Sequence, residues 1–176
     1  MRELRPGDAA ALLQAVYRAE VSRFISLPPT TLEGFERFIL WAEKERIAGR
    51  ALCLGVVEVR SSSLIGLFQV RSLDPSFRVA EWGFALSRDY WGTGLFVESA
   101  CRVLQFVFDE LGVDRLEARA ALANSRGHAA LRKLGAEQAR VGRRALRADG
   151  EHSPEILWTL AASDWARRRA LPAPRH

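Results

Sequence analysis

The stretch EWGFALSRDYWGTGL, residues 81–95, decides the fold. It has the pattern of an apolar strand, then a short loop with two glycines one residue apart, Gly92 and Gly94, then an amphipathic helix. Glycine lets the backbone approach a ligand closely, and the first amides of a helix point outward with partial positive charge. The stretch therefore predicts a site for a phosphate or pyrophosphate group, with a tight turn that binds no ligand as the alternative.

Two familiar nucleotide-binding loops fit this stretch poorly. A dinucleotide-binding loop needs a third small residue, but Val97 occupies that position. A P-loop needs Gly-Lys-Ser/Thr, and nothing similar follows Gly94. Both of these nucleotide-binding interpretations are therefore less favoured.

The patterns on either side of this stretch predict one mixed sheet. Three strands in antiparallel series come first, and strand–helix–strand units follow. The helix that starts at Gly94 must connect two parallel neighbours, strands 79–86 and 116–122. We therefore predict an α+β (or α/β) fold in one domain over residues 1–176, with 163–176 as a C-terminal helix and tail. The other expected elements are a strand at 2–4, helices opened by Asp8 and by Thr30 or Thr31, strands 52–59, 64–70, 138–146 and 155–160, and a helix at 125–134.

Composition is that of a soluble globular chain. Its 176 residues are 48% hydrophobic and 27% charged, which argues against disorder. No apolar run approaches the roughly 20 residues that cross a bilayer, and the polar start at residues 1–8 does not resemble a leader. We therefore expect a cytoplasmic location and no membrane partner. Cys53 and Cys101 lack metal-type spacing, so we expect buried free thiols and no bound metal.

The net charge is +5 with a pI of about 10.0, carried by arginines far more than by lysines. This balance permits an anionic partner, either nucleic acid or a phosphorylated cofactor. Arginines gather at 140–147 and 167–169, and Arg175 lies near the end. No aromatic residues interleave with them as a base-stacking surface requires, so a nucleic-acid-binding domain is the less favoured alternative.

A second stretch, NSRGHAALRKLGA at residues 124–136, follows the next strand. Together the two stretches resemble the GNAT superfamily of acetyl-CoA-dependent N-acetyltransferases, and most closely its ribosomal-protein-alanine N-acetyltransferase-like branch. The resemblance also includes an opening Leu-Arg-Pro and a closing Leu-Trp-Thr-Leu, so it covers nearly the whole chain. The matching motifs are Tyr-Trp-Gly-x-Gly at Tyr90–Gly94, Glu-x-Gly at Glu81–Gly83, and Asn124 followed by Lys133-x-Gly135.

This resemblance implies a central, mostly antiparallel sheet of roughly six to seven strands, with a splayed parallel pair and helices on both faces. The gap between strands 79–86 and 116–122 would take the pantetheine arm of acetyl-CoA. The glycine loop would hold the pyrophosphate. The implied cofactor-binding residues are Phe84, Ala85 and Leu86 on the strand, Trp91, Gly92, Thr93, Gly94, Leu95 and Phe96 on the loop, and Asn124 and Arg126 beyond it.

The implied reaction is direct attack of a primary amine on the thioester of acetyl-CoA. Such a reaction needs proton removal from the ammonium, polarisation of the carbonyl and protonation of the leaving thiolate. Glu81 is the expected base, acting through a water, and Asn124 is expected at the pantetheine or sulfur end. The acceptor is either a protein N-terminus or a small-molecule amine.

Three departures from the family pattern bear on the chemistry. The tyrosine that often follows Lys-x-Gly as general acid is absent, and Gly127 stands where the branch often has a serine. Ser125 or His128 could substitute. Asp89 stands where Gln or Arg is preferred, and we expect it to cap the following turn. The absence of this tyrosine and this serine motivates an alternative function, a catalytically weak acyl-CoA-binding or regulatory module.

We expect the acceptor pocket to be walled by the first two helices, by Phe24 and Glu33, and by the hairpin near 142–150. A peptide terminus, an amino acid and an aminoglycoside-like amine all stay open as acceptors. The pattern permits a homodimer through the terminal strands without requiring one.

Overall fold

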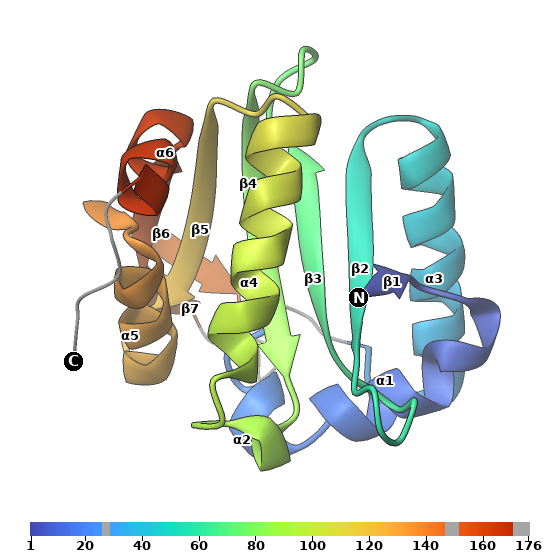
Figure 1. The fold of residues 1–176 in the computed structure, drawn as a ribbon. Coiled ribbons are helices and arrows are strands. Elements are labelled where there is room, and N and C mark those ends of the chain that lie inside the picture. The colour runs from blue at the N-terminus through green and yellow to red at the C-terminus, as the bar shows by residue number, and fades with distance from the viewer. Residues whose placement is uncertain (26–28, 147–151, 171–176) are drawn as a thin grey trace.

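The computed structural model describes residues 1–25, 29–146 and 152–170, with the backbone alone for 142–146 and 152–153. The described residues form one sheet in the order β1-β2-β3-β4-β5-β7-β6 (Figure 1). The strands are β1 (Arg2–Glu3), β2 (Ala51–Val57), β3 (Leu64–Ser72), β4 (Val79–Leu86), β5 (Arg115–Ala121), β6 (Glu137–Leu146) and β7 (His152–Ala161). The α-helices are α1 (Ala9–Val16), α2 (Ala19–Ser22), α3 (Leu32–Ile47), α4 (Leu95–Gln105), α5 (Ser125–Leu134) and α6 (Ala162–Ala170). Shorter turns are the 3-10 turns η1 (Pro6–Asp8) and η2 (Arg88–Tyr90) and the π turn η3 (Phe106–Glu110).

The sheet is mixed, as predicted, and its parallel pair diverges. All neighbouring strands run antiparallel except β4 and β5. Their parallel pairing covers only three positions and ends where Glu81 lies opposite Glu117. β4 continues to Leu86 and β5 to Ala121 beyond that point. The fork in the sheet therefore begins directly after Glu81, which confirms the splayed pair.

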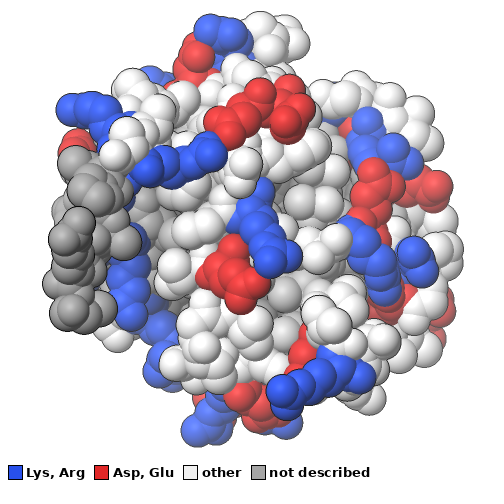
Figure 2. Space-filling view, in the orientation of Figure 1, with Lys and Arg blue, Asp and Glu red and all other residues white. Residues whose placement is uncertain are grey.

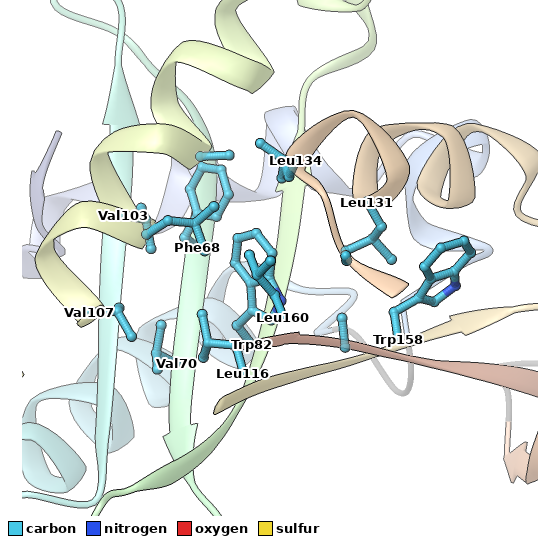
Figure 3. Packing of buried hydrophobic residues seen from close by; sticks show 14 of the residues in the cluster. Phe68, Val70, Trp82, Val103, Val107, Leu116, Leu131, Leu134, Trp158 and Leu160 are labelled. Carbon is cyan, nitrogen blue, oxygen red and sulfur yellow. The ribbon is translucent and has the colours of Figure 1, made fainter. Parts of the chain in front are cut away.

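Helices cover both faces of the sheet, also as predicted. On one face α4, α5 and α6 pack against a large apolar core, in which Trp82 and Leu116 of the sheet meet Val103 of α4 and Leu131 of α5 (Figures 1 and 3). On the other face α1 packs over β3 and β4, and α3 packs over β2 and against α1, around a smaller core that includes Phe35. Among the described residues, no helix combines the length and apolar character needed to cross a membrane.

Asp8 does not cap α1, so that expectation is wrong. Its carboxylate reaches back instead, and it accepts the Arg5 amide and both terminal nitrogens of the Arg2 guanidinium, each at 2.7 Å. Only 11% of the Asp8 side chain is exposed. The hydrogen bonds from Arg2 hold the pKa of the Asp8 carboxyl below its ordinary value, against the opposing effect of burial. The interaction ties β1 to the start of α1.

We expect the Asp8→Asn variant to lose about 1–3 kcal/mol of unfolding free energy at neutral pH, because buried donors lose a charged acceptor. A carboxyl whose pKa is lowered by folding stabilises the protein above its unfolded pKa of about 3.9, and this stabilisation is lost as the pH falls below that value. Urea unfolding of both proteins at neutral pH and near pH 3 measures the effect. The gap between them should shrink in acid, and an equal gap at both pH values would contradict the assignment.

Candidate active site

The divergence of β4 and β5 opens a cavity of about 370 Å³ in the sheet, which we call the slot. Strands β3, β4, β5 and β7 line it, together with α5 and the segment that follows α2. Three of the residues expected at the site line it, Glu81, Phe84 and Asn124. The other residues expected at the site do not line it, namely Ala85, Leu86, Trp91, Gly92, Thr93, Gly94, Leu95, Phe96 and Arg126.

The two sides of the slot differ in character because alternate residues of a strand face opposite sides of the sheet. Trp82, Ala118 and Ala120 are buried on the side of α4 and α5. Glu81 and Arg119 lie on the opposite face, where their side chains approach each other to 3.8 Å. The slot therefore has an apolar half and a charged half.

The glycine loop adopts the conformation that its glycines permit. Gly92 and Gly94 have φ angles of +79° and +87°, in the left-handed region that other residues rarely adopt, and a Cβ on either would meet no atom within 4 Å. Within the described part of the chain, no hydrogen bond engages the amides of Gly92, Thr93, Gly94 or Phe96. These free amides precede and open α4, a helix of 11 residues, and the first amides of a helix attract anions.

Trp91 holds this loop in place. Its indole Nε1 donates to the carbonyl of Leu86 at the end of β4, at 2.8 Å. The guanidinium of Arg126, which comes from α5, lies 4.5 Å from the centre of a Trp91 ring. This stacking brings Arg126 beside the loop, where a cation can meet a phosphate.

Asn124 is the cap of α5, since its Oδ1 accepts the Gly127 amide at 2.9 Å. The Asn124 side chain lies close to Gly127. A Cβ on Gly127 would lie 2.6 Å from Asn124 Nδ2, so a serine there would have to displace the asparagine side chain.

His128 is a structural residue. It is buried, its Nδ1 accepts the Trp158 indole N–H at 3.0 Å, and its Nε2 lies 3.3 Å from the carbonyl of Leu122. A neutral imidazole with its proton on Nε2 satisfies both contacts. His128 does not line the slot, so it does not replace the missing general acid.

Glu81 stands at the fork and belongs to a charged cluster that the sequence motifs did not reveal. Arg71 Nη2 donates to its Oε2 at 2.6 Å, and Arg119 Nε lies 3.8 Å from its Oε1. Glu155 of β7 also lines the slot. Burial raises the pKa of the Glu155 carboxyl; Arg119 opposes this shift and the charge of Glu81 adds to it. The alternation of apolar and polar residues predicts the face of its own strand on which each of Arg71, Glu81 and Arg119 lies. It does not predict that the three side chains lie beside one another.

Phe24, in the segment after α2, lines the slot as expected. Glu33 is not among the lining residues, so that expectation is wrong, and residues 147–151 of the expected hairpin wall lie outside the described residues. Asp89 does not cap the following turn but pairs with Arg18 at 2.8 Å. Arg88 pairs with Glu20 of α2 in the same region. Two ion pairs therefore join η2, which precedes the glycine loop, to α2 and the residue before it.

Charges of both signs are present on the face shown in Figure 2. Two arginines of the α6 cluster pair with carboxylates, Arg167 with Asp164 and Arg169 with Asp109. The side chains of Arg143, Arg144, Arg147 and Arg175 lie outside the described residues. What the structure shows of the arginines therefore gives no support to a nucleic-acid-binding surface.

Comparison with known proteins adds independent evidence. A family model described as an acetyltransferase (GNAT) domain matches residues 1–137. The Bacillus subtilis (strain 168) protein YdaF, provisionally assigned as a ribosomal N-acetyltransferase, is 25% identical over 103 residues, which span 58% of this chain and 56% of that protein. The uncharacterised N-acetyltransferase p20 of Bacillus licheniformis is 22% identical over 167 residues, 94% of each chain.

Solved structures share the fold. Ribosomal-protein-S5-alanine acetyltransferase from Vibrio fischeri superposes with a TM-score of 0.81 at 19% identity over 93% of both chains. Mycobacterium smegmatis RimJ in complex with CoA-disulfide gives 0.83 at 18% identity, over 95% of this chain and 85% of that one. Spermidine N-acetyltransferase from Vibrio cholerae, in complex with CoA and spermine, gives 0.80 at 16% identity, over 94% and 96%. The names of YdaF and of the first two structures agree with the branch that the motifs resemble.

Proposed function

The chain belongs to the acetyltransferase (GNAT) domain family and is an acetyltransferase, and from that premise we propose that it transfers the acetyl group of acetyl-CoA to a primary amine. The observation that carries this proposal is the slot between β4 and β5, which has a charged half on one face. The free amides of the glycine loop follow the end of β4 in the chain. A protein N-terminus and a small amine both fit the relatives' names.

The residues around the slot divide the binding of acetyl-CoA among them. The amides of Gly92, Thr93, Gly94 and Phe96 would hold the pyrophosphate, with Arg126 beside them. Among the described residues, the edge of β4 that faces β5 has no strand partner beyond Glu81, so the backbone at 84–86 can pair with the pantetheine amides. Leu95 opens the helix behind the pyrophosphate, and Trp91 fixes the loop.

Glu81 and Asn124 are proposed to act at the reacting end. Glu81 gives the charged half a fixed negative charge beside the fork, which attracts an ammonium. The Asn124 side chain lines the slot with its Nδ2 amide free of the capping bond, so it can hydrogen-bond the pantetheine or the sulfur end. The amine nitrogen would then form a bond to the thioester carbonyl carbon, and the carbon–sulfur bond would break.

We also propose the cytoplasm as the site of action. Cys53 and Cys101 are free thiols, and free thiols persist in reducing compartments. A homodimer through the terminal strands stays a prediction.

Titration with acetyl-CoA tests the proposal, followed by thiol-release assays against a panel of amines, with ATP and NAD as binding controls. We expect saturable heat and a stabilised fold, by about 2.7 kcal/mol when the ligand stands at a hundredfold excess over its Kd. Failure of acetyl-CoA to bind would contradict the proposal. Binding without transfer to any amine would instead favour the acyl-CoA-binding module.

A further inference from the structure

The charged half of the slot holds two carboxylates in unlike surroundings. Glu81 is anchored, because its Oε2 already accepts the Arg71 guanidinium at 2.6 Å and its Oε1 faces Arg119. Glu155 is half-buried, and across the described residues no hydrogen bond or ion pair engages its carboxylate. The second carboxylate therefore keeps its lone pairs free for a ligand.

Strand register places Glu155 on the same side of the sheet as Arg119. Glu155 lies opposite Ala121 of β5, two residues beyond Arg119, and alternate residues of a strand share a face. Its neighbour on β6 is Gly142. Glu81 lines the slot from β4, so the two carboxylates come from opposite walls of the fork.

We propose that Glu155 takes the proton from the acceptor ammonium, while Glu81 stays charged and holds that ammonium in place. This inference rests on the proposed acetyl transfer and names the proton acceptor within it. One proton passes from the ammonium to a Glu155 oxygen, which leaves a neutral amine whose lone pair attacks the thioester carbonyl carbon. When the carbon–sulfur bond breaks, the electron pair stays on sulfur, and the second proton of the nitrogen neutralises the thiolate. Glu155 then releases its proton to water.

The surroundings of Glu155 suit this role. A general base works best when its pKa is close to the working pH, and an ordinary carboxyl is too acidic. Burial raises the pKa of Glu155; the guanidinium of Arg119 opposes the shift and the charge of Glu81 reinforces it. Arg71 faces the same space from β3, and the uncharged Asn124 faces it from the start of α5. Arg71 donates to Oε2 of Glu81, which leaves its Oε1 to hold the ammonium and Glu155 to accept the proton.

The test is the pH dependence of kcat/KM in thiol release for the wild type and four variants. Glu155→Gln should lower kcat/KM by about 100-fold or more and remove the carboxylate limb of the profile. Glu81→Gln, which removes a neighbouring negative charge, should move that limb to lower pH. Arg119→Gln should move it to higher pH. Glu137→Gln, an exposed carboxylate outside the slot on the neighbouring strand, is the matched control and should follow the wild type.

A second measurement does not need turnover. Carbon-13 NMR of the glutamate carboxyls in the free protein should show one resonance, absent from Glu155→Gln, that titrates above the ordinary value of about 4.3 and moves down in Glu81→Gln. Glu155→Asp, which keeps a shorter carboxylate, should recover part of the rate. A Glu155→Gln enzyme with the wild-type rate and profile would overturn this inference and leave acetyl transfer standing. A wild type that neither binds acetyl-CoA nor releases thiol would overturn both.

Discussion

The Gly94→Val variant is expected to lose measurable binding of acetyl-CoA. Gly94 has a φ of +87°, which costs an L-residue about 1–2 kcal/mol and a β-branched one more, so the loop would relax to negative φ. That change turns the free amides of the loop away from the pyrophosphate. A hydrogen bond to a charged group contributes about 1.5–3 kcal/mol, so losing two of them lowers affinity by about 10²–10⁴-fold.

Gly112→Val is the matched control for this variant. Gly112 also has a positive φ, +69°, and a Cβ there would also meet no atom within 4 Å. It follows η3, at the far end of the α4 segment from the loop. Both variants should lower Tm by similar amounts, but calorimetric titration should show wild-type affinity in Gly112→Val alone. Equal affinities in the two variants would contradict the assignment of the loop.

Elements with local signals could be predicted from the sequence. The strand at 79–86 and the helix at 125–134 have the predicted bounds, because apolar periodicity marks their bodies and Asn124 and Gly135 mark the ends of the helix. Gly135 has the left-handed φ that a helix-ending glycine provides. Such signals depend only on residues that are close together in the chain, so they can be recognised in the sequence.

The charged half of the slot could not be predicted, because it depends on strand register. Arg71 lies beside Glu81 only because β3 and β4 pair in one register, and a slip of one residue would turn either side chain to the other face. Glu155 reaches the same space from β7, a strand that lies much later in the chain than β4 and pairs with β5. Long-range pairing of this kind leaves no local pattern.

His128 and Asp8 show a related difficulty. Each has a residue type and position that suggest a role, a catalytic imidazole and a helix cap. The structure gives each a different partner, Trp158 for His128 and Arg2 for Asp8. A buried polar side chain forms hydrogen bonds with the partners that lie near it in the fold. Its role therefore depends on which distant residue the fold brings near.

Filling the apolar half of the slot should separate ligand binding from stability. Ala120 is buried on β5 and lines the slot on the side of Trp82 and Leu131. A leucine at this position would occupy the space between β4 and β5 and keep the pantetheine arm from the free edge of β4. We expect the Ala120→Leu variant to bind acetyl-CoA at least about 100-fold more weakly, which corresponds to about 2.7 kcal/mol. Its Tm should hold or rise, because the added methyl groups enter a void.

Ala80→Leu provides the contrast. Ala80 is fully buried in the same apolar core, on the neighbouring strand, but it does not line the slot. Extra methyl groups in a packed core cost about 1–3 kcal/mol, so this variant should lose stability and keep its affinity for acetyl-CoA. Thermal unfolding and calorimetric titration of both variants measure the two effects separately. Full affinity in Ala120→Leu would mean that the pantetheine arm does not pass between β4 and β5. A stability loss as large as that of Ala80→Leu would mean that this part of the slot is packed rather than open.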